Sequence, residues 1–578
     1  MVNAAQVSTQ GFGPATFLLG LPVNNGSDLQ FSFSTAASSM YHGLYAQDDW
    51  KITSKLTLNI GLRWDVDVPR TERYNRLSYR DINATSPLAG KVPGFPNLKG
   101  AMMFVGTPNS AYGRHQTPTD LNNFGPRFGF AYHFLPKTVF RAAYGILYSG
   151  SVLQAAGTSG SSGTEGFTSN TAFNATFDNG KTFVSQFPWD NPFPTGYNRP
   201  LGSNPGPYSG PATDIGNGIG DSYFSDYVNP IIQQWNATLQ QELAGWVFEA
   251  GYLGSKGQHL IDGENNLITY NQLPASYFSL GNALNAQVAN PFYGIITTPG
   301  SSLAQPTIQA KQLLVQYPQY TAVNAFRKPG ANSNYQSFTL SANKRFSKGL
   351  QAQVAFTGEK LLDDASQTVT FLGAAGTKQD YYCRHCEKSL SAQDISRRLV
   401  SNFNYELPFG KGKPYLSALP KPLDFVLGGW QINGILTFSK GIPLQISNGG
   451  NNTQINSNGQ RPNNNGQSGE KSGPIADRLN AYFDPSVFAQ AGNFTFGNTS
   501  RTSPNLRAPG IHNLDFSMFK SFRFLEKVTL QFRAEAYNFT NSPTWNQPNV
   551  NVTQVGQFGT VTSATGQRTL QLALRLNY

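Results

Sequence analysis

Apolar and polar residues alternate along many segments of this chain. In the C-terminal segment 569–578 the alternation is strict, and one face carries only leucine and tyrosine: Leu570, Leu572, Leu574, Leu576 and Tyr578. The segments 56–64, 127–134 and 528–537 alternate in the same way. A period of two over about ten residues predicts a strand with one apolar and one polar face.

Strands of this kind occur in two classes of all-β protein. In a sandwich the apolar face is the core, whereas in an outer-membrane barrel it contacts lipid and the polar face lines a wet interior. A membrane strand needs about 9–11 residues, while globular strands average about five or six, so the length of these segments favours a barrel. We expect about thirteen strands, near 41–51, 56–66, 124–134, 138–149, 229–243, 246–260, 334–346, 350–362, 395–408, 427–446, 513–524, 528–540 and 569–578.

The connections between these segments alternate between short and long. The short ones are 52–55, 135–137, 244–245, 347–349 and 525–527, with 409–426 as an intermediate case. The long ones are 67–123, 150–228, 261–333, 363–394, 447–512 and 541–568. Transmembrane barrels have short periplasmic turns and long external loops. The pattern therefore predicts an all-β, antiparallel transmembrane β-barrel whose C-terminal Tyr578 lies in the periplasm.

Composition agrees with an all-β protein and argues against a nucleic-acid partner. Aromatic residues make up 13% of the chain, and charged residues also make up 13%. This share of charged residues is about half the usual one. The net charge is +11, but the basic residues are scattered and form no recognition motif. No apolar run approaches the roughly 18 residues of a membrane helix. The N-terminal residues also lack the cationic and apolar regions of a signal peptide.

Several longer phrases resemble the barrel of TonB-dependent outer-membrane receptors, and in particular their Oar-like branch. They include YHGLYAQDDWKITSKLTLNIGLRWD (41–65), NFGPRFGFAY (123–132), YELPFGKGK (405–413), GGWQINGILTFSKGIPLQIS (428–447) and FRAEAYNFTNSPTW (532–545). The resemblance implies a barrel of about 22 strands that is closed by an N-terminal plug. We therefore expect residues 41–578 to be the C-terminal part of such a barrel, after a lead-in at 1–40 of uncertain structure, with the plug and about nine strands absent.

The resemblance also implies a function and a location. It implies the bacterial outer membrane, where the protein binds a substrate and takes it up with energy from the TonB complex, which acts through the plug. The substrate would be a small molecule, a glycan or a peptide. The segment that ends at Tyr578 resembles the signal that the barrel-assembly machinery recognises. An alternative is a surface-exposed structural or adhesion β-protein without transport.

The CRHC motif at 383–386 is the one constellation that suggests site chemistry. A C-x-x-C pair can be a disulfide, half of a zinc site or a redox pair. Zinc needs four ligands, no second cysteine pair exists, and a short loop should hardly bring His385 to the same metal. The predicted external location is oxidising, which favours a disulfide between Cys383 and Cys386. We expect no metal site and no cofactor.

The remaining candidates have simpler interpretations. We interpret Asp363 and Asp364 as a solvated loop start, and Asp48 and Asp49 as turn formers. SMFK (517–520) imitates an enzyme motif, but it lies on a predicted strand without partner motifs, and nothing in the chain supports an enzyme. Two further sets follow from the alternation. Tryptophans near strand ends suit an aromatic girdle: Trp50, Trp64, Trp246 and Trp430. Charged residues on polar faces would line the lumen: Arg63, Arg127, Arg141, Arg533 and Glu535.

Overall fold

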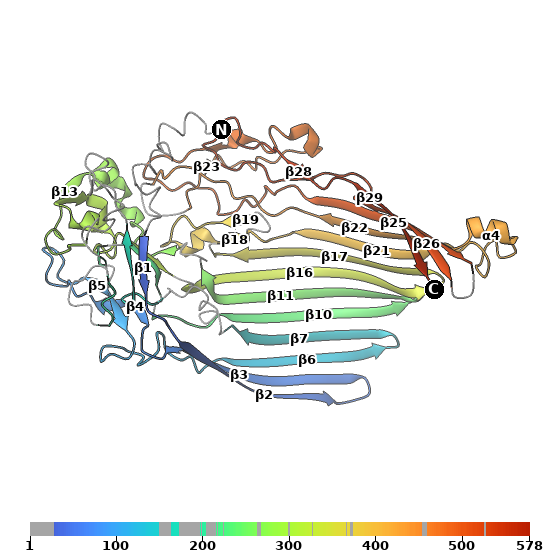
Figure 1. The fold of residues 1–578 in the computed structure, drawn as a ribbon, viewed down its shortest axis with the longest axis horizontal. Coiled ribbons are helices and arrows are strands. Elements are labelled where there is room, and N and C mark those ends of the chain that lie inside the picture. Colours follow the sequence, from blue (N-terminus) through green and yellow to red (C-terminus); the bar gives the residue numbers. More distant parts are fainter. Residues whose placement is uncertain are drawn as a thin grey trace.

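The structure is a computed structural model dominated by one large β-sheet (Figure 1). It describes residues 28–149, 163–172, 197, 199–203, 215–216, 218–222, 225–262, 268–298, 301–325, 328–365, 367–369, 374–453, 459–524 and 528–578. The expectations for residues 1–27 and for segment 150–162 lie outside the described residues, as does the turn at 525–527. No described helix is long and apolar enough to cross a membrane.

Fourteen strands form this antiparallel sheet, and all but β20 (Ser389–Leu390), which pairs with β17, follow one path in chain order. The path confirms the predicted fold class and every expected strand. β2 and β29 are its two edges. The strands along it are β2 (Ala37–Lys51), β3 (Leu56–Glu72), β6 (Phe124–Leu135), β7 (Thr138–Tyr148), β10 (Ile231–Leu243), β11 (Trp246–Asp262), β16 (Lys328–Ser347), β17 (Leu350–Asp363), β21 (Arg397–Glu406), β22 (Trp430–Ser439), β25 (Ile511–Arg523), β26 (Thr529–Tyr537) and β29 (Thr569–Asn577).

The strand register keeps most of the large apolar positions on one side of the sheet. Ile60 is paired with Phe128, and Phe128 with Tyr144. At the other edge, Leu572 and Leu574 are paired with Ala534 and Phe532. We call this side the apolar face and the opposite side the polar face. The β29 leucines are 57–73% exposed, and an apolar surface of this extent is stable only against lipid or another apolar body.

The short connections lie at one end of the sheet, together with the C-terminus (Figure 1). Two of them are two-residue turns, in which both residues have a positive φ: Ala244 and Gly245 (52° and 77°), and Lys348 and Gly349 (52° and 83°). This is the type I′ geometry that matches the twist of a hairpin. The intermediate connection contains the helix α4 (Lys421–Leu427) at the same end.

The prediction that Asp48 and Asp49 form a turn is wrong. Both residues lie inside β2, and the turn begins only after Lys51. Asp49 faces β3, where its carboxylate accepts a hydrogen bond from the side-chain amide of Asn59. The carboxylate is therefore satisfied across the strand pair, and the polar positions of β2 continue down to the turn.

The long connections pack together at the opposite end of the sheet into a body that we call the loop cap, made of the described residues of 73–123, 163–230, 268–325, 364–396, 440–510 and 538–568. It has apolar cores of its own. One joins Leu88, Val92 and Leu98 to Ile215, Phe292 and Tyr317, and another joins Leu444 and Phe483 to Val561. A third packs Leu273 and Leu284 against Phe494. The external loops are thus folded against one another.

Short elements run through the loop cap, and β1, from the N-terminal residues, joins them by pairing with β8. The strands are β1 (Asp28–Ser32), β4 (Ser78–Thr85), β5 (Lys99–Phe104), β8 (Thr168–Ala172), β9 (Gly218–Ser222), β12 (Ile268–Thr269), β13 (Gln287–Ala289), β14 (Thr307–Gln309), β15 (Ala322–Ala325), β18 (Gln367–Val369), β19 (Ala374–Gly376), β23 (Asn463–Asn464), β24 (Phe488–Ala489), β27 (Thr544–Trp545) and β28 (Ala564–Thr565). The 3-10 helices are η3 (Ala275–Asn285), η4 (Ser302–Ala304), η5 (Ala310–Leu314), η7 (Arg384–Glu387), η8 (Ile475–Arg478) and η9 (Pro485–Val487).

The four tryptophans divide between the two ends of the sheet. Trp246 and Trp430 are the first residues of their strands and Trp50 is the last but one of β2, so all three lie beside the shorter connections. Trp64 lies toward the loop cap, where it stacks on Phe124 with ring centroids 6.1 Å apart. Two rows at the ends of the strands are what a girdle requires, and the girdle stays a prediction.

An arginine at Leu572 tests which side of β29 contacts lipid. We expect Leu572→Arg to lower the free energy of unfolding by about 2–4 kcal/mol, because an arginine on the lipid face near the membrane midplane costs that much. The matched control is Gln571→Arg on the polar face, where Glu535 lies opposite in register. Both variants would be refolded into lipid vesicles and unfolded with denaturant. Equal losses for the two variants would contradict this assignment of the faces.

Candidate functional site

The structure places all five predicted lumen residues on the polar face of the sheet. Arg127 lies opposite Gly61, which shares its face of β3 with Arg63. Arg141 pairs with Thr238, and the register continues on one face through Gly251, Thr339, Thr357 and Arg398. Arg533 and Glu535 lie on the same face of β26, near the opposite edge. They share a surface, but they do not form one site.

Most of these charges contact polar neighbours on their own face. Arg63 donates to Asp65 at 2.7 Å and to the hydroxyl of Tyr41 at 2.7 Å. Arg141 donates to Gln240 at 3.1 Å. Arg533 donates to Gln531 at 2.8 Å, and its guanidinium lies 4.9 Å from the ring centroid of Phe519. The polar face is thus a surface of hydrogen-bonding groups, as a wet lining would be.

A pocket of about 600 Å³ lies on this face next to the loop cap, in the middle of the sheet. Hydroxyl groups of Ser337, Thr339 and Thr357 line it together with one acid and one base, Glu359 and Arg398. Glu359 is held in place, because its carboxylate accepts from the Tyr335 hydroxyl at 2.8 Å and from the backbone N–H of Ile395 at 3.1 Å. We call this set the polar-face pocket. It offers donors and acceptors for a polar ligand, and a guanidinium for an anionic group.

The residues of this pocket were not predicted as a site, although the sequence carries a signal for them. Tyr335, Ser337 and Thr339 alternate on one predicted strand, and Thr357 and Glu359 on its hairpin partner. The same alternation that selected Arg63 would have placed these residues on the polar face. Ile395 is a different case, because it was predicted to begin the strand 395–408, whereas β21 begins at Arg397 and Ile395 reaches the pocket from the end of a loop.

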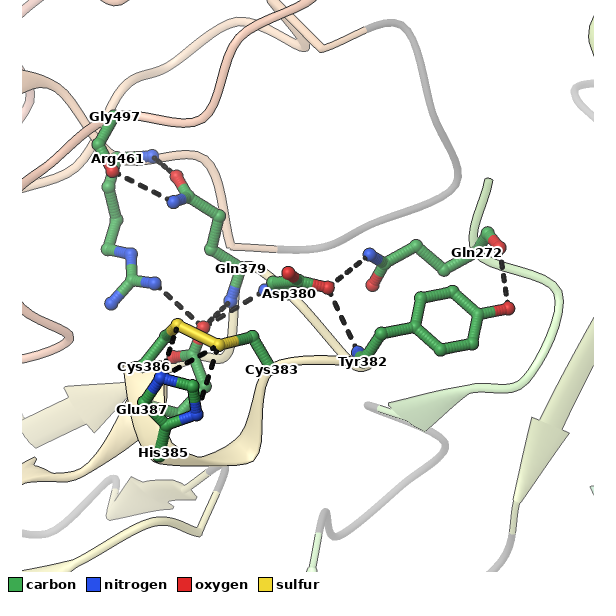
Figure 2. The surroundings of a disulfide bond; sticks show 10 residues. All are labelled: Gln272, Gln379, Asp380, Tyr382, Cys383, His385, Cys386, Glu387, Arg461 and Gly497. Atoms are coloured by element: carbon green, nitrogen blue, oxygen red, sulfur yellow. Dashed lines mark hydrogen bonds and ion pairs between the residues drawn. A yellow bond between two sulfur atoms is a disulfide. The ribbon is translucent and has the colours of Figure 1, made fainter. Parts of the chain in front are cut away.

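Above this face, residues 379–387 connect the two halves of the loop cap, and we call them the bridge segment (Figure 2). On one side, Gln272 donates to Asp380 at 2.7 Å, and the Tyr382 hydroxyl donates to the Gln272 carbonyl at 3.0 Å. On the other side, Gln379 donates to the carbonyl of Gly497 at 2.9 Å. The bridge segment therefore ties the N-terminal loops to the C-terminal loops through hydrogen bonds on both of its sides.

Buried ion pairs fasten the bridge segment and its neighbours. Glu387 is fully buried, and its carboxylate accepts from Arg461 at 2.7 Å and from the N–H groups of Gln379 and Asp380 at 3.1 and 3.0 Å. Burial lowers the pKa of Arg461, and the charge of Glu387 opposes that shift. A buried charge without such a partner would carry a desolvation cost of several kcal/mol.

The interpretation of Asp363 and Asp364 as a solvated loop start is wrong. Their exposed fractions are only 4% and 7%. Asp363 pairs with the buried Arg501, and Asp364 accepts from Arg384 at 2.6 Å. Both carboxylates receive arginines from the loop cap, one of them from a distant loop, so a pattern in the local sequence could not reveal their burial.

The structure joins Cys383 to Cys386 in a disulfide within the bridge segment. His385 lies against this disulfide. Its Nδ1 lies 3.5 Å from the sulfur of Cys383, and its Nε2 lies 3.8 Å from that of Cys386. The 3-10 turn η7 turns the imidazole back over both sulfur atoms (Figure 2). The short loop was expected hardly to bring His385 to the same metal as the cysteines, yet the ligand atoms of the three residues lie within 4.8 Å of one another.

Comparison with known proteins gives one family. The family model of the outer membrane beta barrel domain matches residues 2–571, and no curated protein matches the chain. Among solved structures, the chain is similar to the ferripyoverdine receptor of the outer membrane of Pseudomonas aeruginosa, with 9% identity and a TM-score of 0.37 over 94% of this chain and 39% of that one. It is also similar to the ferric-catecholate import receptor Fiu of Escherichia coli, with 10% identity and a TM-score of 0.37 over 94% of this chain and 45% of that one. A third similar structure is the outer membrane transporter YddB of the same species, with 11% identity and a TM-score of 0.39 over 94% of this chain and 55% of that one. The chain thus spans between 39% and 55% of the length of these proteins.

Removing one side of a buried ion pair tests how firmly the loop cap is held. We expect Arg501→Met to lower the stability of the loop cap by about 3–5 kcal/mol, because it leaves the Asp363 carboxylate buried without this partner. The control is Lys137→Met, which breaks the exposed pair with Glu242 (63% and 46% exposed) and should cost less than about 1 kcal/mol. Hydrogen exchange of loop amides measures both. Similar exchange rates in the two variants would contradict the prediction.

Proposed function

The chain belongs to the outer membrane beta barrel domain family, and we propose that it is the barrel of a TonB-dependent receptor of the Oar-like kind, which binds a substrate at the cell surface and takes it up with energy. Its location is the outer membrane. Residues 41–578 would form the barrel, after a lead-in at 1–40. The TonB complex would act through a plug domain, so it enters the proposal only as a partner of the whole receptor.

The observation that carries the proposal is the continuity between the loop cap and the polar face. The polar-face pocket is lined by strand residues and by Ile395, which belongs to the loop cap. A second pocket of about 350 Å³ continues on the same face around Arg127 and Asn236, and Asn236 lines both. A ligand bound at the loops would therefore meet a series of polar side chains along the sheet, which an adhesion surface would not need.

The chemistry of these pockets favours a polar substrate. Hydroxyl and amide groups line them, and the charges of Glu359 and Arg398 lie on the same surface. Such a lining suits a small polar molecule, a glycan or a peptide, because each presents several hydrogen-bonding groups at once. The barrel-assembly machinery would recognise the strand from Leu570 to Tyr578, whose terminal tyrosine is 96% exposed.

The test is energy-dependent uptake by cells that carry the whole receptor in their outer membrane. The probes are a panel of iron chelates, vitamins, oligosaccharides and peptides, whose loss from the medium is followed with and without a protonophore. We expect at least one class to be depleted only by energised cells. Substrate that is bound but never taken up would overturn the proposal and favour the structural or adhesion alternative.

Arg398→Gln tests the role of the polar-face pocket in that uptake. We expect the variant to need about tenfold more substrate for half-maximal uptake, because a hydrogen bond to a charged group contributes about 1.5–3 kcal/mol. The matched control is Arg397→Gln, since Arg397 precedes it on the same strand and lies on the other face, opposite Gly358. Both variants should reach the membrane at the parental level. An equal effect in the two variants would exclude the pocket as the binding surface.

A further inference from the structure

The CRHC turn of the bridge segment brings three potential metal ligands together. The sulfur atoms of Cys383 and Cys386 and one ring nitrogen of His385 all lie within 4.8 Å of one another. His385 and Cys386 are exposed, and Cys383 is half-buried. A cation could therefore reach all three from solvent, and distances of about 2.0–2.3 Å to nitrogen and sulfur need only small movements of the side chains.

The surroundings of the turn favour a positive ion more than its sequence suggests. Arg384 stands between the ligands in the chain, but its guanidinium donates to Asp364 at 2.6 Å, so its charge is paired on the side of the loop cap. Both ring nitrogens of His385 lie near the sulfur of Cys383, at 3.5 and 3.7 Å, and Nε2 also lies 3.8 Å from the sulfur of Cys386. The imidazole is thus already directed at the place that a cation would occupy (Figure 2).

The backbone of the turn is held by contacts other than the disulfide. Glu387 accepts from the N–H groups of Gln379 and Asp380, and the carbonyl of Glu387 accepts from Arg501 at 3.0 Å. Cys386 donates its own N–H to the carbonyl of Cys383 at 3.0 Å. With both ends of the turn fixed in this way, the two cysteines stay close together when the bond between their sulfur atoms is absent.

We propose that the reduced CRHC turn is a binding site for a thiophilic cation such as Zn²⁺, with Cys383, His385 and Cys386 as its three protein ligands and water as the fourth. A dithiol or phosphine reductant supplies two electrons, two protons are taken up, and the disulfide becomes two thiols. The cation then displaces the two thiol protons as it binds. Two sulfur ligands and one imidazole are a donor set that zinc accepts. The site does not depend on the proposed transport function.

The cation would then take over the role of the disulfide. Either one links Cys383 to Cys386 and closes the turn between Asp380 and Glu387, the residues through which the two halves of the loop cap meet. The turn would accordingly have three states: one with the disulfide, one with the bound cation, and one that is reduced and metal-free.

The test is a titration of the full chain in detergent with Zn²⁺ against a chromophoric chelator, before and after reduction with a phosphine that is then removed. We expect one equivalent to bind to the reduced protein with release of protons, and none to the oxidised protein. A reduced protein that binds no zinc would overturn the proposal.

Three variants identify the ligands. Cys383→Ser with Cys386→Ser should abolish the reduction-dependent binding. His385→Ala should weaken it more than about tenfold, because even the loss of a residue that only supports a ligand costs 10–100-fold. His133→Ala is the control, as His133 is exposed near a short turn, and it should bind like the parent. Zinc binding that persists in the double cysteine variant, or that is unchanged in His385→Ala, would overturn the assignment of the ligands.

Discussion

The structure depends on one constraint, which is that every backbone N–H and C=O group inside a membrane must find a partner within the protein. Between the two edge strands, the long strands meet it by pairing with both neighbours in chain order, and β2 and β29 each pair with one neighbour. Because that pairing is antiparallel and in register, it also sorts the side chains. Leucine and aromatic residues gather on one face, and arginine, glutamine and hydroxyl groups gather on the other. Both the face that contacts lipid and the polar-face pocket follow from this one pattern of strand pairing.

The loop cap obeys a different rule, because its backbone lies outside the sheet and must be stabilised by packing. Its cores take residues from connections that are far apart in sequence, as when Leu88 packs with Phe292 and Leu273 with Phe494. Each of these cores is shared by at least two loops. Together they hold a surface above the sheet, and Ile395 carries that surface into the polar-face pocket.

The same difference explains what could be predicted. The strands of the sheet and the turns Ala244–Gly245 and Lys348–Gly349 follow from alternation and turn chemistry, which are local properties. The face of Arg127 or Arg533 follows from them as well. The burial of Asp363 could not be predicted, because its arginine comes from residue 501, in another loop. The ring of His385 was misjudged for a related reason, since a single 3-10 turn reverses its direction.

The positions of the charged residues show where ion pairs fix the arrangement of the loops. Charged residues are only 13% of the sequence, yet several of them form buried pairs between separate segments of the loop cap and the adjoining strand ends: Glu387 with Arg461, Asp363 with Arg501, Asp394 with Arg507 and Asp262 with Lys378. Such pairs add little net stability over apolar contacts, but a wrong arrangement leaves a charge buried alone. The ion pairs therefore select one arrangement of the loops, whereas apolar packing alone would define the arrangement less closely. Three of the four pairs involve the bridge segment or residues within eight positions of it. The CRHC turn therefore lies where the ion pairs fix the loops relative to one another, and the proposed reduction and metal binding would act at that place.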